Sequence, residues 1–282
     1  MVNLQKKQID DTVLKNQEKS KLKSLDRFYE NLGLSYEDSH YYIHPFGISR
    51  KKKLLKLLSP NKNDVICDLG CGDGNLSKDL IKQVKEVYGT DISPTRVERA
   101  RKNGIKAFCY DVCSTHFKSN YFDKIICSEV IEHVIEPREL LRETYRLLKG
   151  NGTVVLTVPY NQVIEKTILQ IPKKELEQMN FYEIIKKYNI PDAHLNSFSK
   201  EEIISIMEEE GFKVKQVDFT HKYEPIFKSK KIYHFISYIK LRTRFIKKSK
   251  RINSLFDIFI FSAYRKKKEK GHIIVCACKK NH

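Results

Sequence analysis

The sequence predicts an α/β fold with a parallel β-sheet, on three observations. The apolar run Val65-Ile66-Cys67 is typical of a short buried strand, and it leads directly into the glycine-rich turn Asp68-Leu69-Gly70-Cys71-Gly72-Asp73-Gly74. After the turn, apolar residues recur at helical spacing within residues 75–84. Strand-like runs and helical segments keep alternating downstream, in a chain of 282 residues that is long enough for one large core. A strand, a glycine turn and a helix form the opening unit of a nucleotide-binding α/β domain.

The spacing of the glycines narrows the choice of ligand. A dinucleotide site requires the pattern G-x-G-x-x-G, and Asn75 occupies the position of its third glycine. The residues present, Asp68, Gly70, Gly72 and Gly74, follow the pattern D-x-G-x-G-x-G. This pattern resembles motif I of the class I S-adenosylmethionine (SAM) methyltransferases. The resemblance implies that these four residues hold the methionine end of SAM.

Two acids stand at the ends of the second and third expected strands, residues 86–92 and 107–112. A carboxylate at the second strand end can accept hydrogen bonds from both ribose hydroxyls, and an apolar neighbour can pack on adenine. A carboxylate at the third strand end can accept from the adenine amino group. The expected contacts of the adenosine part are therefore Asp91, Ile92, Asp111 and Val112.

The resemblance continues beyond these strands. Further strands are expected at residues 121–128 and 153–158, and segments 129–134, 140–149 and 194–199 resemble the group that contains the ubiquinone-pathway O-methyltransferases. The resemblance covers residues 48–218 and the last strand. It implies a Rossmann-like seven-stranded sheet of order 3-2-1-4-5-7-6, flanked by helices, with strand seven antiparallel. Strand six would span residues 212–219, and strand seven residues 272–278.

The segment after the fourth strand carries the candidate catalytic residues. Glu129, Glu132 and His133 are spaced i, i+3, i+4, so a helical turn would place them on one face beside the transferred methyl group, which Ser128 would also border. His194 follows 61 residues after His133 and can return to the same edge of the sheet. One interpretation is that the two carboxylates and two imidazoles bind Mg²⁺ or Mn²⁺, a set that resembles the small-RNA 3′-terminal 2′-O-methyltransferases. The alternatives are that His133 acts without a metal, as a base or substrate contact, or that the segment is structural.

The chain divides into four expected regions. These are a helical N-terminal cap at residues 1–47, a SAM-binding core at 48–219, a basic aromatic insertion at 220–271, and the final core strand at 272–282. The net charge is +18, and residues 226–270 alone hold 15 Lys and Arg against two acids. Three interpretations of this stretch stay open: a helical lid, an amphipathic helix on an anionic membrane surface, or an RNA-binding surface.

Composition and patterning indicate the compartment. The seven cysteines show no C-x-x-C pair and fall mostly on expected strands, so we expect thiols in a reducing environment. The N-terminal residues lack the apolar core of a secretory leader. The apolar stretch at residues 252–264 is shorter than the roughly 20 residues that span a bilayer. We expect a cytoplasmic protein, or one peripheral at the membrane, with no obligate protein partner.

The sequence thus predicts a SAM-dependent methyltransferase that acts on an oxygen atom of a small molecule, a lipid precursor or a glycan precursor. The Asn/Asp-Pro-Pro-Tyr signature of adenine amino methylation is absent after the fourth strand, and no Pro-Cys nucleophile for pyrimidine methylation is present. An RNA methyltransferase acting on a ribose 2′-hydroxyl is the alternative. A non-catalytic SAM-fold module that binds RNA or membrane is a third hypothesis.

Overall fold

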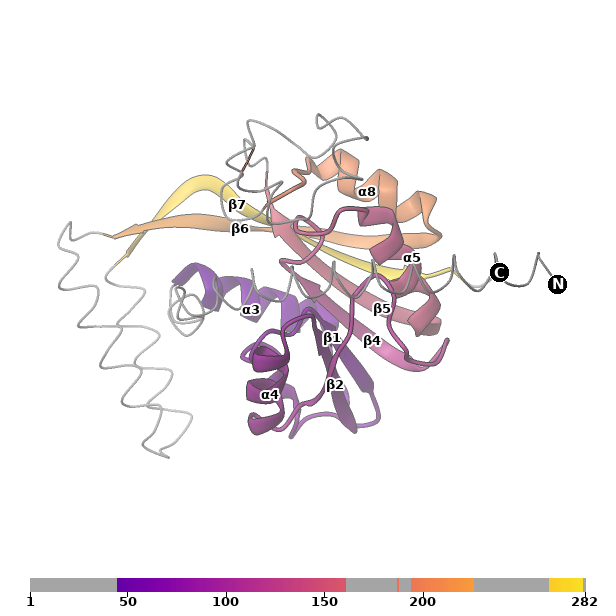
Figure 1. The fold of residues 1–282 in the computed structure, drawn as a ribbon. Coiled ribbons are helices and arrows are strands. Elements are labelled where there is room, and N and C mark those ends of the chain that lie inside the picture. Colours follow the sequence, from indigo (N-terminus) through magenta and orange to yellow (C-terminus); the bar gives the residue numbers. More distant parts are fainter. Residues whose placement is uncertain (1–44, 161–186, 188–193, 226–263, 281–282) are drawn as a thin grey trace.

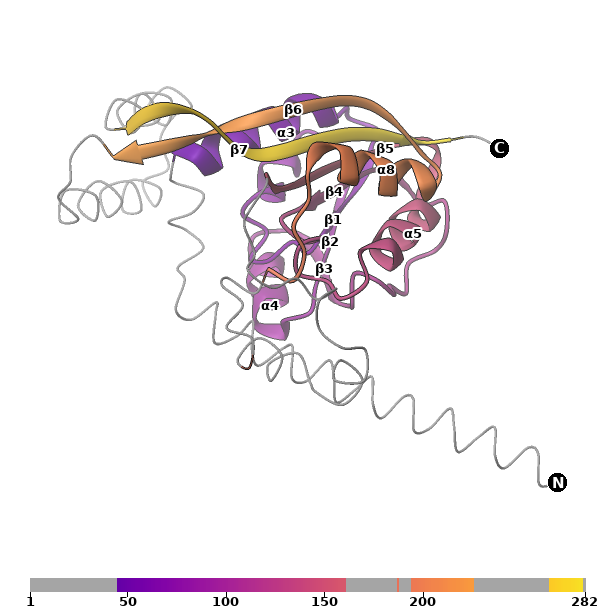
Figure 2. The ribbon, with the colours of Figure 1, turned by 90° about the horizontal axis from the view of Figure 1, so that it is seen from above.

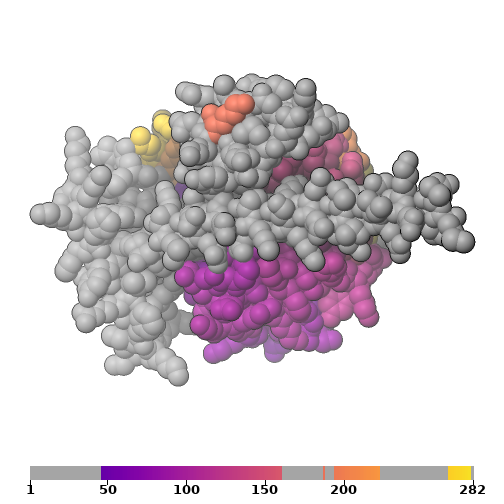
Figure 3. Space-filling view, in the orientation of Figure 1, coloured from indigo at the N-terminus to yellow at the C-terminus, as the bar shows by residue number. Residues whose placement is uncertain are grey.

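A computed structural model describes residues 45–160, 187, 194–225 and 264–280 (Figure 1), and Figure 3 shows the same division on the molecular surface. In this part of the chain, seven strands form one sheet of order β3-β2-β1-β4-β5-β7-β6. Strands β1 to β5 pair in parallel, and β7 pairs antiparallel with both β5 and β6. The predicted strand order and the antiparallel seventh strand are confirmed.

The elements have the following bounds. The strands are β1 (Val65–Leu69), β2 (Glu86–Asp91), β3 (Lys106–Cys109), β4 (Phe122–Ser128), β5 (Leu148–Pro159), β6 (Phe212–Pro225) and β7 (Tyr264–Lys279). The helices are α3 (Pro45–Leu58), the 3₁₀ helix η1 (Ser77–Leu80), α4 (Pro94–Lys102), α5 (Pro137–Leu147) and α8 (Lys200–Glu209).

Helices cover both faces of the sheet, as Figure 2 shows. Side chains of α3 and α4 pack on one face, against alternate strand residues such as Ile66 and Ile126. Side chains of α5 and α8 pack on the other face, against Cys67 and Ile125. Because successive strand residues point to opposite faces, a sheet covered on both sides needs continuous apolar strands, and all five residues of β1 are buried. Polar strand residues such as Asp91 and Ser128 therefore stand at the carboxyl ends of their strands.

Helix starts follow local capping chemistry. Ser93 precedes α4, its hydroxyl accepts from the Arg96 amide, and proline occupies the first turn. Ser199 and Glu202 form a reciprocal capping box at the start of α8. This second cap fixes where the chain turns from the 194–198 segment into α8.

The segment after the glycine turn differs from the prediction of a helix within residues 75–84. Only Ser77–Leu80 is helical, as a single 3₁₀ turn. Leu76 and Leu80 are buried, but Ile81 is 36% exposed, so only part of the apolar pattern is anchored in the core. Packing of Leu76 and Leu80 alone does not stabilise the longer α-helix that the spacing predicts, because short helices depend on tertiary packing of an apolar face.

The last two strands are longer than predicted. Residues 220–225 and 264–271, which the sequence places in an insertion, extend β6 and β7 and pair with each other, His221 with Lys270 and Tyr223 with Lys266. Figure 1 shows this two-stranded ribbon projecting from the sheet. The sequence missed it because Lys-rich strands that face water lack the apolar alternation by which strands are recognised. The rest of the insertion, residues 226–263, and most of the N-terminal cap lie outside the described residues.

Two compartment expectations bear on the described residues. None of the seven cysteines forms a disulfide there, and five of them are buried as predicted: Cys67, Cys71, Cys127, Cys276 and Cys278. Cys109 is exposed, contrary to the prediction, because it ends β3 beside the open edge of the sheet. In the part of the chain that is described, no helix is both long and apolar enough to cross a membrane.

Candidate active site

The glycine turn lies at the carboxyl end of β1, where ligands bind in open α/β sheets. Gly70, Gly72 and Gly74 all have positive φ angles, of 71°, 52° and 74°. A Cβ atom at Gly70 would lie 2.5 Å from a methyl carbon of Val130, and one at Gly74 would lie 2.9 Å from Ile105. Glycine is therefore required both by the backbone conformation and by the close packing under the turn.

Asp68 ends β1 immediately before the turn and is 2% exposed. Its Oδ2 atom has no hydrogen-bond partner among the described residues. Burial, together with the nearby Asp91 carboxylate, raises the pKa of Asp68 to about 7. A buried carboxyl oxygen without a partner beside a glycine cradle fits a ligand that brings a cationic hydrogen-bond donor.

Asp91, at the end of β2, braces the turn. Its Oδ2 accepts from the Gly72 amide at 2.9 Å, and its Oδ1 accepts from the Ser93 amide at 3.0 Å. Burial raises the pKa of Asp91, although the Arg96 charge opposes the shift. Each oxygen keeps a lone pair, so the bracing contacts leave room for a hydroxyl donor.

The residues predicted to contact adenine are less buried than Asp68 and Asp91. β3 ends at Cys109, so Asp111 lies two residues beyond the strand rather than on it. Its Oδ1 accepts from the Cys113 amide at 2.9 Å, which closes a side-chain turn. Val112 packs against the core as a half-buried side chain, and Ile92 is half-buried after β2. The strand is therefore shorter than predicted. Hydrogen bonds from a side chain to the nearby backbone, such as that of Asp111, compete with the backbone hydrogen bonds of the sheet.

Glu129 follows β4 with a left-handed φ of 58°, and its carboxylate is enclosed by three partners. Arg50, 1% exposed, lies 2.8 Å away through Nη1, and His272 lies 2.6 Å away through Nε2. The Thr157 hydroxyl donates to the other oxygen at 2.8 Å. Although burial opposes ionisation, Arg50 and His272 hold the pKa of Glu129 well below its usual range. This Arg50–Glu129–His272 network joins α3, β4 and β7.

Sequence reasoning did not find Arg50, His272 and Thr157 as the partners of Glu129. The signal for the last two was weak, because each is a single polar residue next to or within a short apolar run, residues 273–278 for His272 and 154–158 for Thr157. Their meeting depends on the antiparallel register of β7 on β5, which sets Thr157 opposite Ile274 and Pro159 opposite His272. Ser128, predicted to border the methyl group, is half-buried with its hydroxyl 2.9 Å from that of Thr157.

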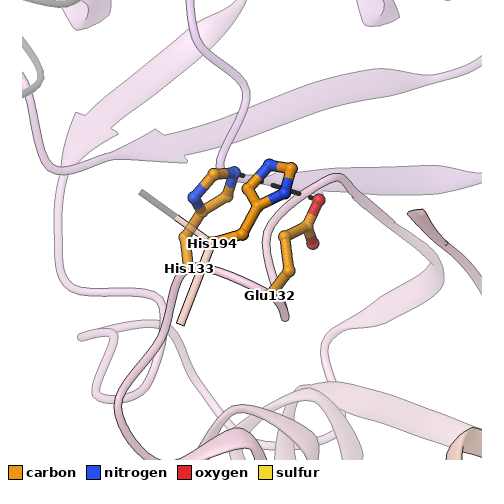
Figure 4. Close-up of side chains that lie close together, drawn as sticks. All are labelled: Glu132, His133 and His194. Atoms are coloured by element: carbon orange, nitrogen blue, oxygen red, sulfur yellow. Dashed lines mark ion pairs between the residues drawn. The ribbon is translucent and has the colours of Figure 1, made fainter. Parts of the chain in front are cut away.

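Glu132, His133 and His194 come together at the same edge of the sheet (Figure 4), and their potential ligand atoms all lie within 4.8 Å of one another. Residues 131–133 form a turn, and the helix begins only at Pro137, so the expected helical face is wrong. The left-handed backbone at Glu129 redirects the chain, and Glu129 joins Arg50 and His272 instead of this group. Three of the four residues named from the sequence therefore lie together, and their role as metal ligands stays a prediction.

A model of the family described as "Methyltransferase domain" matches residues 43–217. A mitochondrial ubiquinone biosynthesis O-methyltransferase from Schizosaccharomyces pombe is 32% identical over 112 residues, 37% of this chain and 39% of that protein. Another, from Pelagibacter ubique, is 29% identical over 166 residues, 56% of this chain and 65% of that protein. The chain therefore spans less than two thirds of these curated relatives.

Solved structures give the same fold. A SAM-dependent methyltransferase from Thermotoga maritima, titled a possible histamine N-methyltransferase, aligns with a TM-score of 0.53 at 20% identity, over 91% of this chain and 99% of that one. A SAM-dependent methyltransferase from Mesorhizobium loti aligns with a TM-score of 0.51 at 16% identity, over 81% and 96%. The family match covers more than half of the sequence, and the sheet order agrees with it. The chain belongs to the methyltransferase-domain family, with the seven-stranded fold of the class I SAM-dependent methyltransferases.

Proposed function

We propose that the protein transfers the methyl group of SAM to an oxygen atom of a small-molecule or lipid-precursor acceptor. The observation that carries the proposal is the buried Asp68 carboxyl, which has an unpartnered oxygen beside three glycines of positive φ. The SAM α-ammonium supplies the donor that this oxygen lacks. The curated relatives named above, both O-methyltransferases, support oxygen as the acceptor atom.

Each part of SAM has proposed partners in the chain. Asp68, Gly70, Gly72 and Gly74 hold the methionine part. Asp91 accepts from the ribose hydroxyls with the lone pairs that the Gly72 and Ser93 amides leave unused. Ile92, Asp111 and Val112 border the adenine, and Ser128 borders the methyl group.

The reaction is a displacement in which SAM supplies an activated methyl carbon. The carbon–sulfur bond breaks with its electron pair going to sulfur, and a carbon–oxygen bond forms with a lone pair of the acceptor. The hydroxyl proton must also leave, to water at the substrate edge, and the group of Glu132, His133 and His194 is the proposed place where the hydroxyl is activated for this loss. Glu129 is a positioning residue, because Arg50, His272 and Thr157 already surround its carboxylate.

The proposed acceptor class has one further observation in its support. The ribbon of residues 220–225 and 264–271 carries exposed lysines, including Lys266, Lys268 and Lys270. A cationic surface next to the substrate edge suits contact with an anionic membrane, from which a lipid precursor could be drawn. We therefore propose a peripheral membrane location for the protein during turnover.

The test is incubation of the protein with methyl-labelled SAM and a cell extract, followed by separation into RNA and organic-solvent fractions. Label in the organic fraction is expected. Label in RNA would replace the proposed acceptor by a ribose hydroxyl, the alternative that the sequence also allows. No label in any fraction, together with no binding of SAM by calorimetry, would refute the methyltransferase activity itself.

A further inference from the structure

Glu132 is the least satisfied acid at the substrate edge. The residue is 0% exposed, and neither of its carboxyl oxygens has a hydrogen-bond partner among the described residues. Nε2 of His133 lies 3.9 Å from the Oε1 atom of Glu132, which is too long for a hydrogen bond. Burying a carboxyl group without partners is unfavourable, so its presence in a native structure requires an explanation, and a bound ion is one that fits a carboxyl group.

Two imidazoles face this carboxyl group. The rings of His133 and His194 lie 4.7 Å apart at 68°, and Figure 4 shows both beside the Glu132 oxygens. Both histidines are half-buried, whereas Glu132 is buried. A carboxyl oxygen and two ring nitrogens within 4.8 Å form a donor set of one oxygen and two nitrogens.

The backbone holds the two segments that carry this group. The carbonyl oxygen of Glu132 accepts from the amides of Leu195 at 2.7 Å and Asn196 at 3.0 Å. The side-chain amide of Asn196, itself buried, donates to the Val134 carbonyl at 2.7 Å. His194 is therefore fixed beside His133 by contacts that do not involve either imidazole. Such outer contacts are what orients ligands in built metal sites.

Among the described residues, the charges near Glu132 favour a cation. Glu129, three residues earlier, is paired with Arg50 and His272, yet its carboxylate, after burial, still raises the pKa of Glu132. An anionic ligand is therefore unfavourable beside these two carboxyl groups, and a cation is the ligand class that they favour.

We infer that Glu132, His133 and His194 bind one divalent transition-metal ion. Two imidazoles and one carboxylate are the donors of many Zn²⁺ and Fe²⁺ sites, whereas Mg²⁺ prefers oxygen ligands alone. Ligand atoms of one ion lie about 3.4 Å apart when each is about 2.1 Å from it in tetrahedral geometry, so small side-chain rotations would close the group. The donor set therefore argues against the predicted Mg²⁺, whereas Mn²⁺ stays among the transition-metal ions, and Glu129 is removed from the ligands. Only the ion's role rests on the proposed function: beside the acceptor it would lower the pKa of the hydroxyl.

The test is titration of the full-length, tag-free and metal-depleted chain with Co²⁺, read by visible absorption. Co²⁺ is chosen because thiolate ligands add a near-ultraviolet charge-transfer band, which separates this site from the exposed Cys109. The variants are Glu132→Gln and His194→Asn, and the matched control is His116→Asn, an exposed histidine outside the group. Circular dichroism and thermal melts verify that each variant folds.

We expect a visible band that saturates at one equivalent in the wild type and in His116→Asn, without a thiolate band. Both site variants should bind Co²⁺ at least about 100-fold more weakly, since even loss of outer contacts weakens metal binding by about 10–100-fold. Zn²⁺ should displace Co²⁺, and Mg²⁺ should not. An absent band, a thiolate band, or equal binding by the folded site variants would overturn the inference. SAM binding by calorimetry is measured on the same metal-free samples, so a failure of the metal site is distinguishable from a failure of the proposed function.

Discussion

Binding of SAM is expected to weaken as the pH falls through 7, because Asp68 must be ionised to pair with the SAM α-ammonium. Burial and the Asp91 carboxylate raise the pKa of Asp68 to about 7 in the ligand-free protein. The sign follows directly: below that pKa the carboxyl group is mostly neutral, so part of the binding free energy is used to remove its proton. Affinity should therefore rise with pH through 7 and level off about one pH unit above the pKa.

The size of the effect follows from the ionised fraction of Asp68. With a pKa of about 7, that fraction falls from about one half at pH 7 to about one tenth at pH 6, which predicts a roughly fivefold weaker apparent affinity. The range from about pH 6 to about pH 7 lies below the ordinary α-amino pKa of about 7.7–8.0, so the positive charge of the SAM α-ammonium changes little.

The assay is isothermal titration calorimetry of SAM binding at pH 6.0, 6.5 and 7.0, in buffers with matched ionic strength. The matched variant is Asp68→Asn, which keeps the shape of the side chain and cannot titrate. We expect weaker binding by the variant at every pH and no dependence on pH. If the variant keeps the fivefold dependence, or if the wild type shows none, the reasoning about Asp68 is refuted.

Three further predictions concern stability and positioning. Gly70→Ala would place Cβ 2.5 Å from Val130 at a φ of 71°; we expect a loss of about 1–3 kcal/mol in urea unfolding and loss of SAM binding, and normal SAM affinity would contradict the proposed cradle. Arg50→Met leaves the Glu129 carboxylate without its cation, so the free energy of unfolding should fall by about 3 kcal/mol, and a double-mutant cycle with Glu129→Gln should recover part of it; additive effects would show that the pair does not interact. Ser199→Ala removes the capping box of α8 and should lower stability by about 1 kcal/mol without changing SAM affinity, and an unchanged melting temperature would count against the cap.

The proposed site shows where sequence reasoning worked and where it failed. Asp68, the three glycines and Asp91 were predicted as a unit, because turn chemistry and strand ends are local properties of the chain. Glu132, His133 and His194 were also predicted, and the structure brings them together. Glu129 was assigned to the same group because helical spacing was assumed. Its left-handed backbone, with the Arg50 and His272 contacts, shows that the side chain belongs to another network.

The sequence by itself determined the fold class and the turn at the end of β1, while the order of the strands was implied by the family resemblance. Apolar periodicity, glycine spacing and strand-end acids are short-range signals, which do not depend on how distant segments of the chain are arranged. Tertiary structure alone decided which partners surround Glu129, since Arg50 and His272 are separated by 222 positions in the sequence. It also decided the length of the β6–β7 ribbon, whose strands pair with each other far beyond the apolar run that the sequence shows. Long-range register and pairing depend on the whole packed sheet, and no local pattern encodes them.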